Sequence, residues 1–210
     1  MTSLAQTERA ALCDTALQVG EDQPTLCEGW DVKDLVVHLL VREGSLGAVG
    51  IAVPSLESLT ERASRRIGRG EFTVLVERLR KGPPRFSVYA LPKADAMLNS
   101  LEYFVHHEDI RRAQPGWTAR VLGDDVEKTL WEMAKTAGKG LTRKLPVGVT
   151  AENVTTGSRM TLSTGTSEVT VRGVPSEVIV YLFGRKSQAD VELLGDDEAV
   201  AALSEASLGF

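Results

Sequence analysis

A carboxylate and an imidazole at helical spacing single out the segment LEYFVHHEDIRRA, residues 101–113, of this 210-residue chain. Glu102 and His106 are four residues apart, which places them one above the other on a single helix face. That face is otherwise apolar, with Leu98, Leu101 and Val105 around Glu102, so an uncompensated carboxylate there would carry a desolvation penalty. A divalent metal ion would compensate it, because carboxylate and imidazole are a common ligand set for zinc and related ions.

A catalytic metal site takes a third protein ligand and leaves one position open for water or substrate. His38 is the only histidine outside the segment, and apolar residues flank it three positions to either side, as at the edge of a buried helical stripe. Asp109, three residues after His106, could orient that imidazole by accepting from its other ring nitrogen. His107 faces elsewhere. The spacing therefore predicts a metal site of His38, Glu102 and His106, supported by Asp109.

Plainer interpretations of the same residues stay open. A Glu four positions before a His can be a simple ion pair, and a His at an apolar helix edge can be a hydrogen-bonded core residue, so the cluster could be a buried network without metal. The basic runs at 62–69 and 111–112 are typical of a solvated face. Cys27 is expected to be a small buried residue, since no adjacent base is evident. The glycine-rich run at 47–50 lacks the lysine and the strand–turn–helix context of a phosphate loop.

The composition is that of a globular protein with no general attraction to polyanions. The chain has 24 Lys and Arg against 29 Asp and Glu, a formal charge of −5, which argues against binding to nucleic acid or to an anionic membrane surface. No stretch reaches the roughly 20 apolar residues of a membrane span, and the first residues carry charges where a signal peptide needs an apolar run. We therefore expect a cytoplasmic protein in which Cys13 and Cys27 are both reduced.

Helices are expected to position the candidate ligands. The predicted helices of the first part cover residues 3–20, 32–46, 56–81 and 94–113. Gly20 is suited to end the first, Asp31 to cap the second, and Gly68 and Gly70 can divide the third. Modest connectors favour an antiparallel four-helix bundle over residues 1–118. The third ligand would then come from the second helix, and the Glu–His pair from the last.

The pattern changes after Trp117, where β-type segments join the helices. The predicted elements are helices at 124–141, from Pro175 to Gly184 and after Asp196, and strands at 147–152, 160–163, 168–172 and 191–194. Apolar and polar residues alternate in 160–163 and 168–172, as in half-buried antiparallel strands. The fold class is therefore predicted to be α+β, with a small α+β domain at 119–210.

Three blocks of the sequence carry a family resemblance. They are LCEGWDVKDLVVHL at 26–39, EYFVHHED at 102–109, and VPSEVIVYLFGRK followed by VELLGDD between 174 and 197. Together they resemble the mycothiol-dependent maleylpyruvate isomerase family, within the DinB/YfiT-like superfamily, over most of the chain. The doublet His106-His107 and the residues after it resemble an uncharacterised actinobacterial metal-binding branch rather than the isomerase proper.

The resemblance implies a fold, a ligand set and a cosubstrate. It implies a DinB-like four-helix bundle that binds zinc through His38, Glu102 and His106, and mycothiol, a low-molecular-weight thiol, as cosubstrate. It also makes Arg185 a candidate anchor for an anionic substrate. Because of the departure around the histidine doublet, the maleylpyruvate substrate is not carried over.

These expectations combine into a metal-dependent enzyme that activates a low-molecular-weight thiol, mycothiol being suspected, for S-transfer or thiol-assisted isomerisation of a small electrophile. The alternatives are a metal-assisted hydrolase, in which the ion activates water, and a non-catalytic protein that uses the metal to hold a small ligand. The expected partners are a small-molecule thiol and a substrate. Neither the catalytic base nor the oligomeric state, monomer or homodimer, follows from the sequence.

Overall fold

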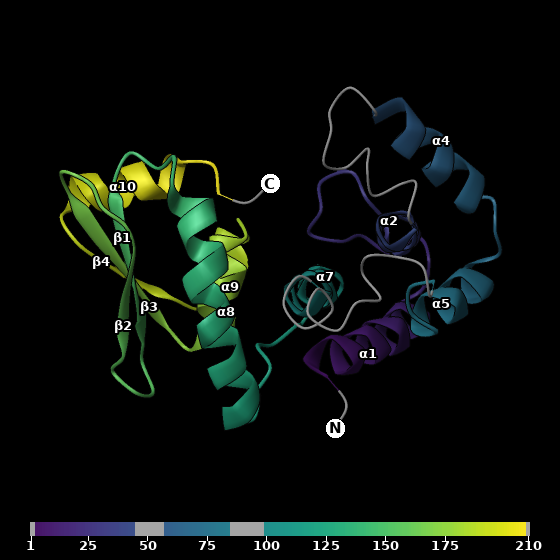
Figure 1. Cartoon of the computed structure of the whole chain (residues 1–210), viewed down its shortest axis with the longest axis horizontal. Coiled ribbons are helices and arrows are strands. Elements are labelled where there is room, and N and C mark those ends of the chain that lie inside the picture. Colours follow the sequence, from purple (N-terminus) through teal and green to yellow (C-terminus); the bar gives the residue numbers. More distant parts are fainter. Residues whose placement is uncertain (1–2, 45–56, 85–98, 209–210) are drawn as a thin grey trace. The chain divides into compact units, whose positions relative to one another are not determined.

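The structure, a computed structural model, describes residues 3–44, 57–84 and 99–208. The chain divides into two units, residues 1–118 and 119–210, and each unit has its own hydrophobic core (Figure 1). None of the described helices is both long enough and apolar enough to cross a membrane.

The first unit is built from helices that follow the predicted positions. Its described helices are α1 (Leu4–Val19), α2 (Val32–Glu43), α4 (Glu57–Ile67), α5 (Phe72–Arg80) and α7 (Ser100–Arg112). The segment predicted as one helix over 56–81 forms α4 and α5, with Gly68 and Gly70 between them. Residues 45–46 of the second predicted helix and 94–98 of the last lie outside the described residues.

Local capping signals explain where the first two helices begin. The Ser3 side chain accepts from the backbone N–H of Gln6 at 3.2 Å, and the Gln6 side chain accepts in return from the N–H of Ser3 at 3.1 Å. Asp31 caps α2, as predicted, by accepting from the N–H of Asp34 at 2.8 Å. Gly20 ends α1 with a φ of 101°, a conformation that favours glycine. The loop between α1 and α2 therefore has defined ends.

Apolar packing holds the helices that carry the candidate ligands. α1 packs against α5 and α7, and α2 packs against α4 and α5 (Figure 1). Leu39 of α2, Leu79 of α5 and Tyr103 of α7 are fully buried members of one core. Burial of an apolar side chain of this size contributes about 1.5–3 kcal/mol, so this core holds α2 and α7 in one unit together with α1 and α5. The antiparallel four-helix arrangement expected for the unit stays a prediction.

The second unit combines a sheet with helices, which is the predicted α+β class. Its described elements are α8 (Asp124–Thr142), β1 (Gly148–Asn153), β2 (Arg159–Ser163), β3 (Glu168–Gly173), α9 (Pro175–Leu182), the 3₁₀ turn η4 (Lys186–Gln188), β4 (Glu192–Leu194) and α10 (Asp197–Glu205). The strand order is β2-β1-β3-β4. α8 packs against β1 and β2, while α9 and α10 pack against β3 (Figure 1).

β2 and β3 each have an antiparallel neighbour, in the pairs β1–β2 and β3–β4, as their alternating patterns predicted. The pairing of β1 with β3 is parallel. The link from β2 to β3, residues 164–167, passes across the start of β1. Gly148 and Gly165 let the two backbones approach closely there, and the N–H of Gly148 donates to the carbonyl of Ser167 at 2.8 Å. Alternation of apolar and polar residues reports which face is buried, but not in which direction a strand runs.

Candidate metal centre

Two helices bring the predicted ligands to one point. His38 lies on α2, and Glu102 and His106 lie one turn apart on α7. Glu102 Oε1 is 3.4 Å from His38 Nε2 and 3.3 Å from His106 Nε2. The three candidate ligand atoms all lie within 4.8 Å of one another. Their side chains are between 12% and 24% exposed, so solvent reaches the cluster.

These separations fit a small divalent ion. Ligands held at about 2.1 Å from a tetrahedral zinc ion lie roughly 3.4 Å apart along each edge of the tetrahedron. The distances from the Glu102 oxygen to the two imidazole nitrogens, 3.4 and 3.3 Å, match that edge. Two imidazoles and one carboxylate are also a donor set found in catalytic zinc sites that keep a fourth position open.

The hydrogen bond on the far side of His106 indicates that a metal ion or a second proton lies in this gap. His106 Nδ1 lies 2.9 Å from Asp109 Oδ2, and because an ionised carboxylate can only accept, this ring nitrogen carries a proton. In a neutral ring the other nitrogen, Nε2, then presents a lone pair to Glu102 Oε1, which is also an acceptor. Two acceptors 3.3 Å apart repel each other unless a second proton or a metal ion lies between them.

The electrostatics of the cluster favour an ionised carboxylate beside a cation. Burial raises the pKa of Glu102, but hydrogen bonds from the two histidines and the charge of Arg42 outweigh it and hold the pKa well below its usual range. Burial lowers the pKa of His106, but hydrogen bonds to Asp109, Cys27 and Glu102 raise it overall well above its ordinary value. Glu102 is therefore negatively charged at neutral pH and available to a metal ion.

Arg42 is a neighbour of the cluster that the sequence reasoning missed. Its Nε lies 3.3 Å from Glu102 Oε1, and its Nη1 donates to Asn99 Oδ1 at 2.7 Å. The guanidinium is buried and supplies part of the positive charge that the apolar face around Glu102 was expected to need. Arg42 could have been identified from its position four residues after His38, because this spacing places both side chains on one face of α2.

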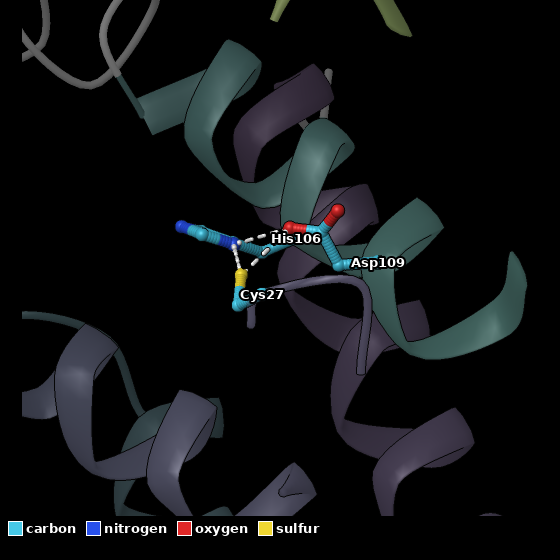
Figure 2. Close-up of side chains that lie close together, drawn as sticks. All are labelled: Cys27, His106 and Asp109. Carbon is cyan, nitrogen blue, oxygen red and sulfur yellow. Dashed lines mark hydrogen bonds and ion pairs between the residues drawn. The ribbon is translucent and has the colours of Figure 1, made fainter. Parts of the chain in front are cut away.

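A second cluster lies behind His106 (Figure 2). The Asp109 side chain is fully buried, and its Oδ2 accepts from His106 Nδ1 at 2.9 Å and from the Cys27 thiol at 3.3 Å. Cys27 Sγ also lies 3.9 Å from His106 Nδ1. The expectation that Cys27 has no adjacent base is therefore wrong. The interhelical loop brings it next to residues 79 and 82 positions away in the sequence. Cys13 and Cys27 are not joined in a disulfide.

An aromatic ring flanks the cluster, and the remaining histidine points away from it. The ring of Trp30 lies 4.9 Å from that of His38 and is 36% exposed. His107 faces away from the cluster, as predicted, and contacts α1, with Nδ1 3.0 Å from Glu8 Oε2 and Nε2 2.9 Å from the hydroxyl of Thr15.

The other predicted site residue, Arg185, belongs to the second unit. It follows α9, its backbone N–H donates to the carbonyl of Val180 at 3.1 Å, and its guanidinium donates to the carbonyl of Phe183. These contacts fix the residue at the C-terminal end of α9. Its role as an anchor for an anionic substrate stays a prediction.

Two solved structures resemble the chain along nearly its whole length. One is the crystal structure of the mycothiol-dependent maleylpyruvate isomerase, which is 15% identical, with 90% of each chain covered and a TM-score of 0.58. The other is a histidine-to-alanine mutant of the mycothiol-dependent maleylpyruvate isomerase, 16% identical over 90% of each chain with a TM-score of 0.55. No family model matches the chain, and a comparison with curated proteins finds no match. At this level of identity, the likeness shows that the chain shares the fold of these structures.

Proposed function

We propose that the chain is a metal-dependent enzyme that activates a low-molecular-weight thiol, with mycothiol as the candidate, for S-transfer or thiol-assisted isomerisation of a small electrophile. One observation carries the proposal: donor atoms of His38, Glu102 and His106 converge on a gap where a metal ion or a second proton must lie between Glu102 and His106. Zinc suits this set of two imidazoles and one carboxylate.

Each side chain would have a distinct task. His38 and His106 would donate Nε2 lone pairs and Glu102 its Oε1, while Asp109 would hold the ring of His106 through Nδ1–H. A bound zinc ion would favour the thiolate form of a thiol at neutral pH. The partial exposure of the three donors leaves access for such a thiol. The Arg42 guanidinium beside Glu102 would keep this carboxylate ionised in the metal-free protein.

The fold likeness supports a thiol as the group that is activated. The similar structures are described as mycothiol-dependent, and their fold extends over 90% of this chain. In this proposal residues 1–118 form a DinB-like four-helix bundle that binds the metal, and Arg185 binds an anionic group of the substrate. Maleylpyruvate is left out, because the residues after the histidine doublet depart from the isomerase pattern.

Metal analysis and calorimetry together test the proposal. Wild-type protein incubated with zinc and desalted should hold about one equivalent of the metal, and mycothiol titrated into it should give heat of binding. His38→Ala and Glu102→Gln should lose both properties. His107→Gln is the matched control, because His107 lies on the same helix but outside the cluster. A wild-type protein that retains no metal and gives no heat with mycothiol would refute the proposal.

The same measurements separate the alternatives. Metal binding without heat from mycothiol, combined with thiol-independent turnover of ester or amide substrates, would identify a metal-assisted hydrolase. Metal binding with no turnover of any kind would leave a non-catalytic protein that holds a small ligand. A melting temperature that does not respond to a chelator, in protein that carries no metal, would identify a structural hydrogen-bonded network.

A further inference from the structure

The loop between α1 and α2 carries Cys27 and is fixed onto α7. The backbone N–H of Leu26 donates to the carbonyl of Asp109 at 3.1 Å, and the side chain of Gln114 donates to the carbonyl of Pro24 at 3.0 Å. Both contacts join residues just before the cysteine to the end of the helix that carries His106 and Asp109. The position of the Cys27 thiol is therefore set by the backbone of its loop.

The Cys27 thiol and the His106 ring share one acceptor (Figure 2). Both donate to Oδ2 of Asp109, at 3.3 and 2.9 Å. Because the Asp109 side chain is fully buried, protein donors replace the water that would otherwise solvate its charge. The thiol thus helps to hold the carboxylate in one orientation, and the carboxylate determines which nitrogen of His106 carries the proton.

Direct metal binding by Cys27 fits these distances less well. Its sulfur forms a compact group with His106 Nδ1 and Asp109 Oδ2. However, the 2.9 Å between Nδ1 and Oδ2 is a hydrogen-bond length, shorter than the roughly 3.4 Å between two ligands of a tetrahedral ion. An ion in this group would also displace the Nδ1 proton. A supporting hydrogen bond explains the geometry better than a second metal site.

We infer that Cys27 is a positioning residue of the metal centre. Its thiol holds Asp109, Asp109 holds the Nδ1–H of His106, and the Nε2 lone pair is thereby kept aimed at the gap beside Glu102. This inference rests on the proposed metal site and adds to it a residue from outside the two helices that supply the ligands.

Three variants of the full chain test the inference: Cys27→Ala, Cys27→Ser and Cys13→Ala. Cys13 is the matched control, because it is a fully buried thiol that donates instead to the carbonyl of Val76 at 3.7 Å. For each protein, the affinity for zinc and for cobalt is measured by competition with a chromophoric chelator. The absorption spectrum of the cobalt form and the melting temperature of the metal-free form are also recorded.

Cys27→Ala should bind both metals about tenfold more weakly, at the lower end of the effects seen when a hydrogen bond behind a metal ligand is removed. Cys27→Ser keeps a donor to Asp109 and should stay within about threefold of wild type. Cys13→Ala should bind both metals like wild type, even if its melting temperature falls. The wild-type cobalt form should lack the intense near-ultraviolet charge-transfer band of a sulfur ligand.

Several results would overturn the inference. If wild type and Cys27→Ala bind metal with equal affinity, the inference is overturned and the proposed metal site stands. If Cys13→Ala loses as much metal affinity as Cys27→Ala, the inference is also overturned, because the loss would then come from lower stability of the fold. An intense near-ultraviolet cobalt band that disappears in Cys27→Ser would make the thiol a ligand instead. Wild-type protein that binds neither metal would overturn the proposed function, and this inference with it.

Discussion

At the scale of single residues, Arg42 and a metal ion compete for the same carboxylate. The guanidinium is buried and lies 3.3 Å from Glu102 Oε1, so it stabilises the metal-free cluster and repels a divalent cation. Arg42→Met should bind zinc about threefold to tenfold more tightly. It should also lower the free energy of unfolding of the metal-free protein by about 1–3 kcal/mol. Chelator competition and urea unfolding measure the two effects.

A variant of a surface arginine, Arg65→Met, is the control for Arg42→Met. Arg65 pairs with Glu61 at 3.2 Å on an exposed face of α4, so Arg65→Met should change neither zinc affinity nor stability measurably. Weaker zinc binding in Arg42→Met would contradict the prediction, and it would mean that Arg42 orients Glu102 for the metal rather than competing with it.

Trp30 offers an optical report on the site. Its ring lies 4.9 Å from that of His38, close enough for a paramagnetic ion held by His38 to quench its fluorescence. Cobalt should therefore reduce the tryptophan emission of wild type, and Trp30→Phe should remove most of that response. Trp117→Phe is the control, because Trp117 packs under Arg112 instead. Quenching that persists in Trp30→Phe and vanishes in Trp117→Phe would place the ion elsewhere.

The residues of the site differ in how far sequence alone could predict them. The helical period placed Glu102 and His106 on one face and Asp109 within reach, because these relations depend on local geometry alone. Cys27 could not be placed in the same way. Its contact with Asp109, 82 positions later in the sequence, depends on how a loop docks on a helix, and no periodicity encodes that contact.

At the scale of elements, a buried polar contact links α1 to α7. His107 lies between Glu8 and Thr15, and Glu8 and His107 are both nearly fully buried. Glu8→Ala should lower the free energy of unfolding by about 2–4 kcal/mol, because it leaves the imidazole buried with one partner fewer. Urea unfolding measures the loss, and Glu8→Gln, which keeps an acceptor, should lose less. Zinc affinity should be unchanged in both variants, so a loss in zinc binding would tie His107 to the metal site.

The crossing of the β2–β3 link over β1 makes a further prediction about stability. A Cβ at Gly165 would collide with the backbone at Gly148 and Val147, so Gly165→Ala should lower the free energy of unfolding by about 1–3 kcal/mol. Gly140 lies on α8 with open space around its Cα, and Gly140→Ala should raise it by about 0.5–1 kcal/mol. Urea unfolding of the two variants should give opposite signs; destabilisation by both would contradict this account of the crossing.

The direction of β3 marks a limit of sequence-based reasoning at this scale. The strand positions followed from alternation and turn residues, but parallel pairing of β1 with β3 depends on which edge of β1 the chain reaches after β2. The four-residue link between β2 and β3 can cross the start of β1 because both residues at the closest contact, Gly148 and Gly165, are glycines. The sequence shows Gly148 at the start of a predicted strand, but it does not show that Gly165 is the residue that contacts it.

At the scale of the whole molecule, the described part of the chain forms two cores that share no residue. The boundary between the units falls between residues 118 and 119 of the sequence, next to the change of pattern after Trp117. A periodicity analysis can detect such a change, because helical and β-type apolar spacing differ within each stretch. Periodicity does not identify the substrate. The chain shares its fold with a mycothiol-dependent enzyme, but the reaction depends on the residues and ligands of one site.

All three proposed donors lie in the first unit, so metal removal should affect the stability of the molecule through residues 1–118. Zinc at a thousand times its dissociation constant would stabilise the folded state by about 4 kcal/mol. For a unit of this size, that stabilisation corresponds to a rise in melting temperature of about 10–20 °C. Differential scanning calorimetry with zinc and with a chelator measures the rise, which His38→Ala should abolish. The isolated segment 119–210 contains none of the donors and should melt at the same temperature under both conditions. A zinc-dependent shift in that segment, or an undiminished shift in His38→Ala, would show that the stabilising ion binds outside the cluster formed by α2 and α7.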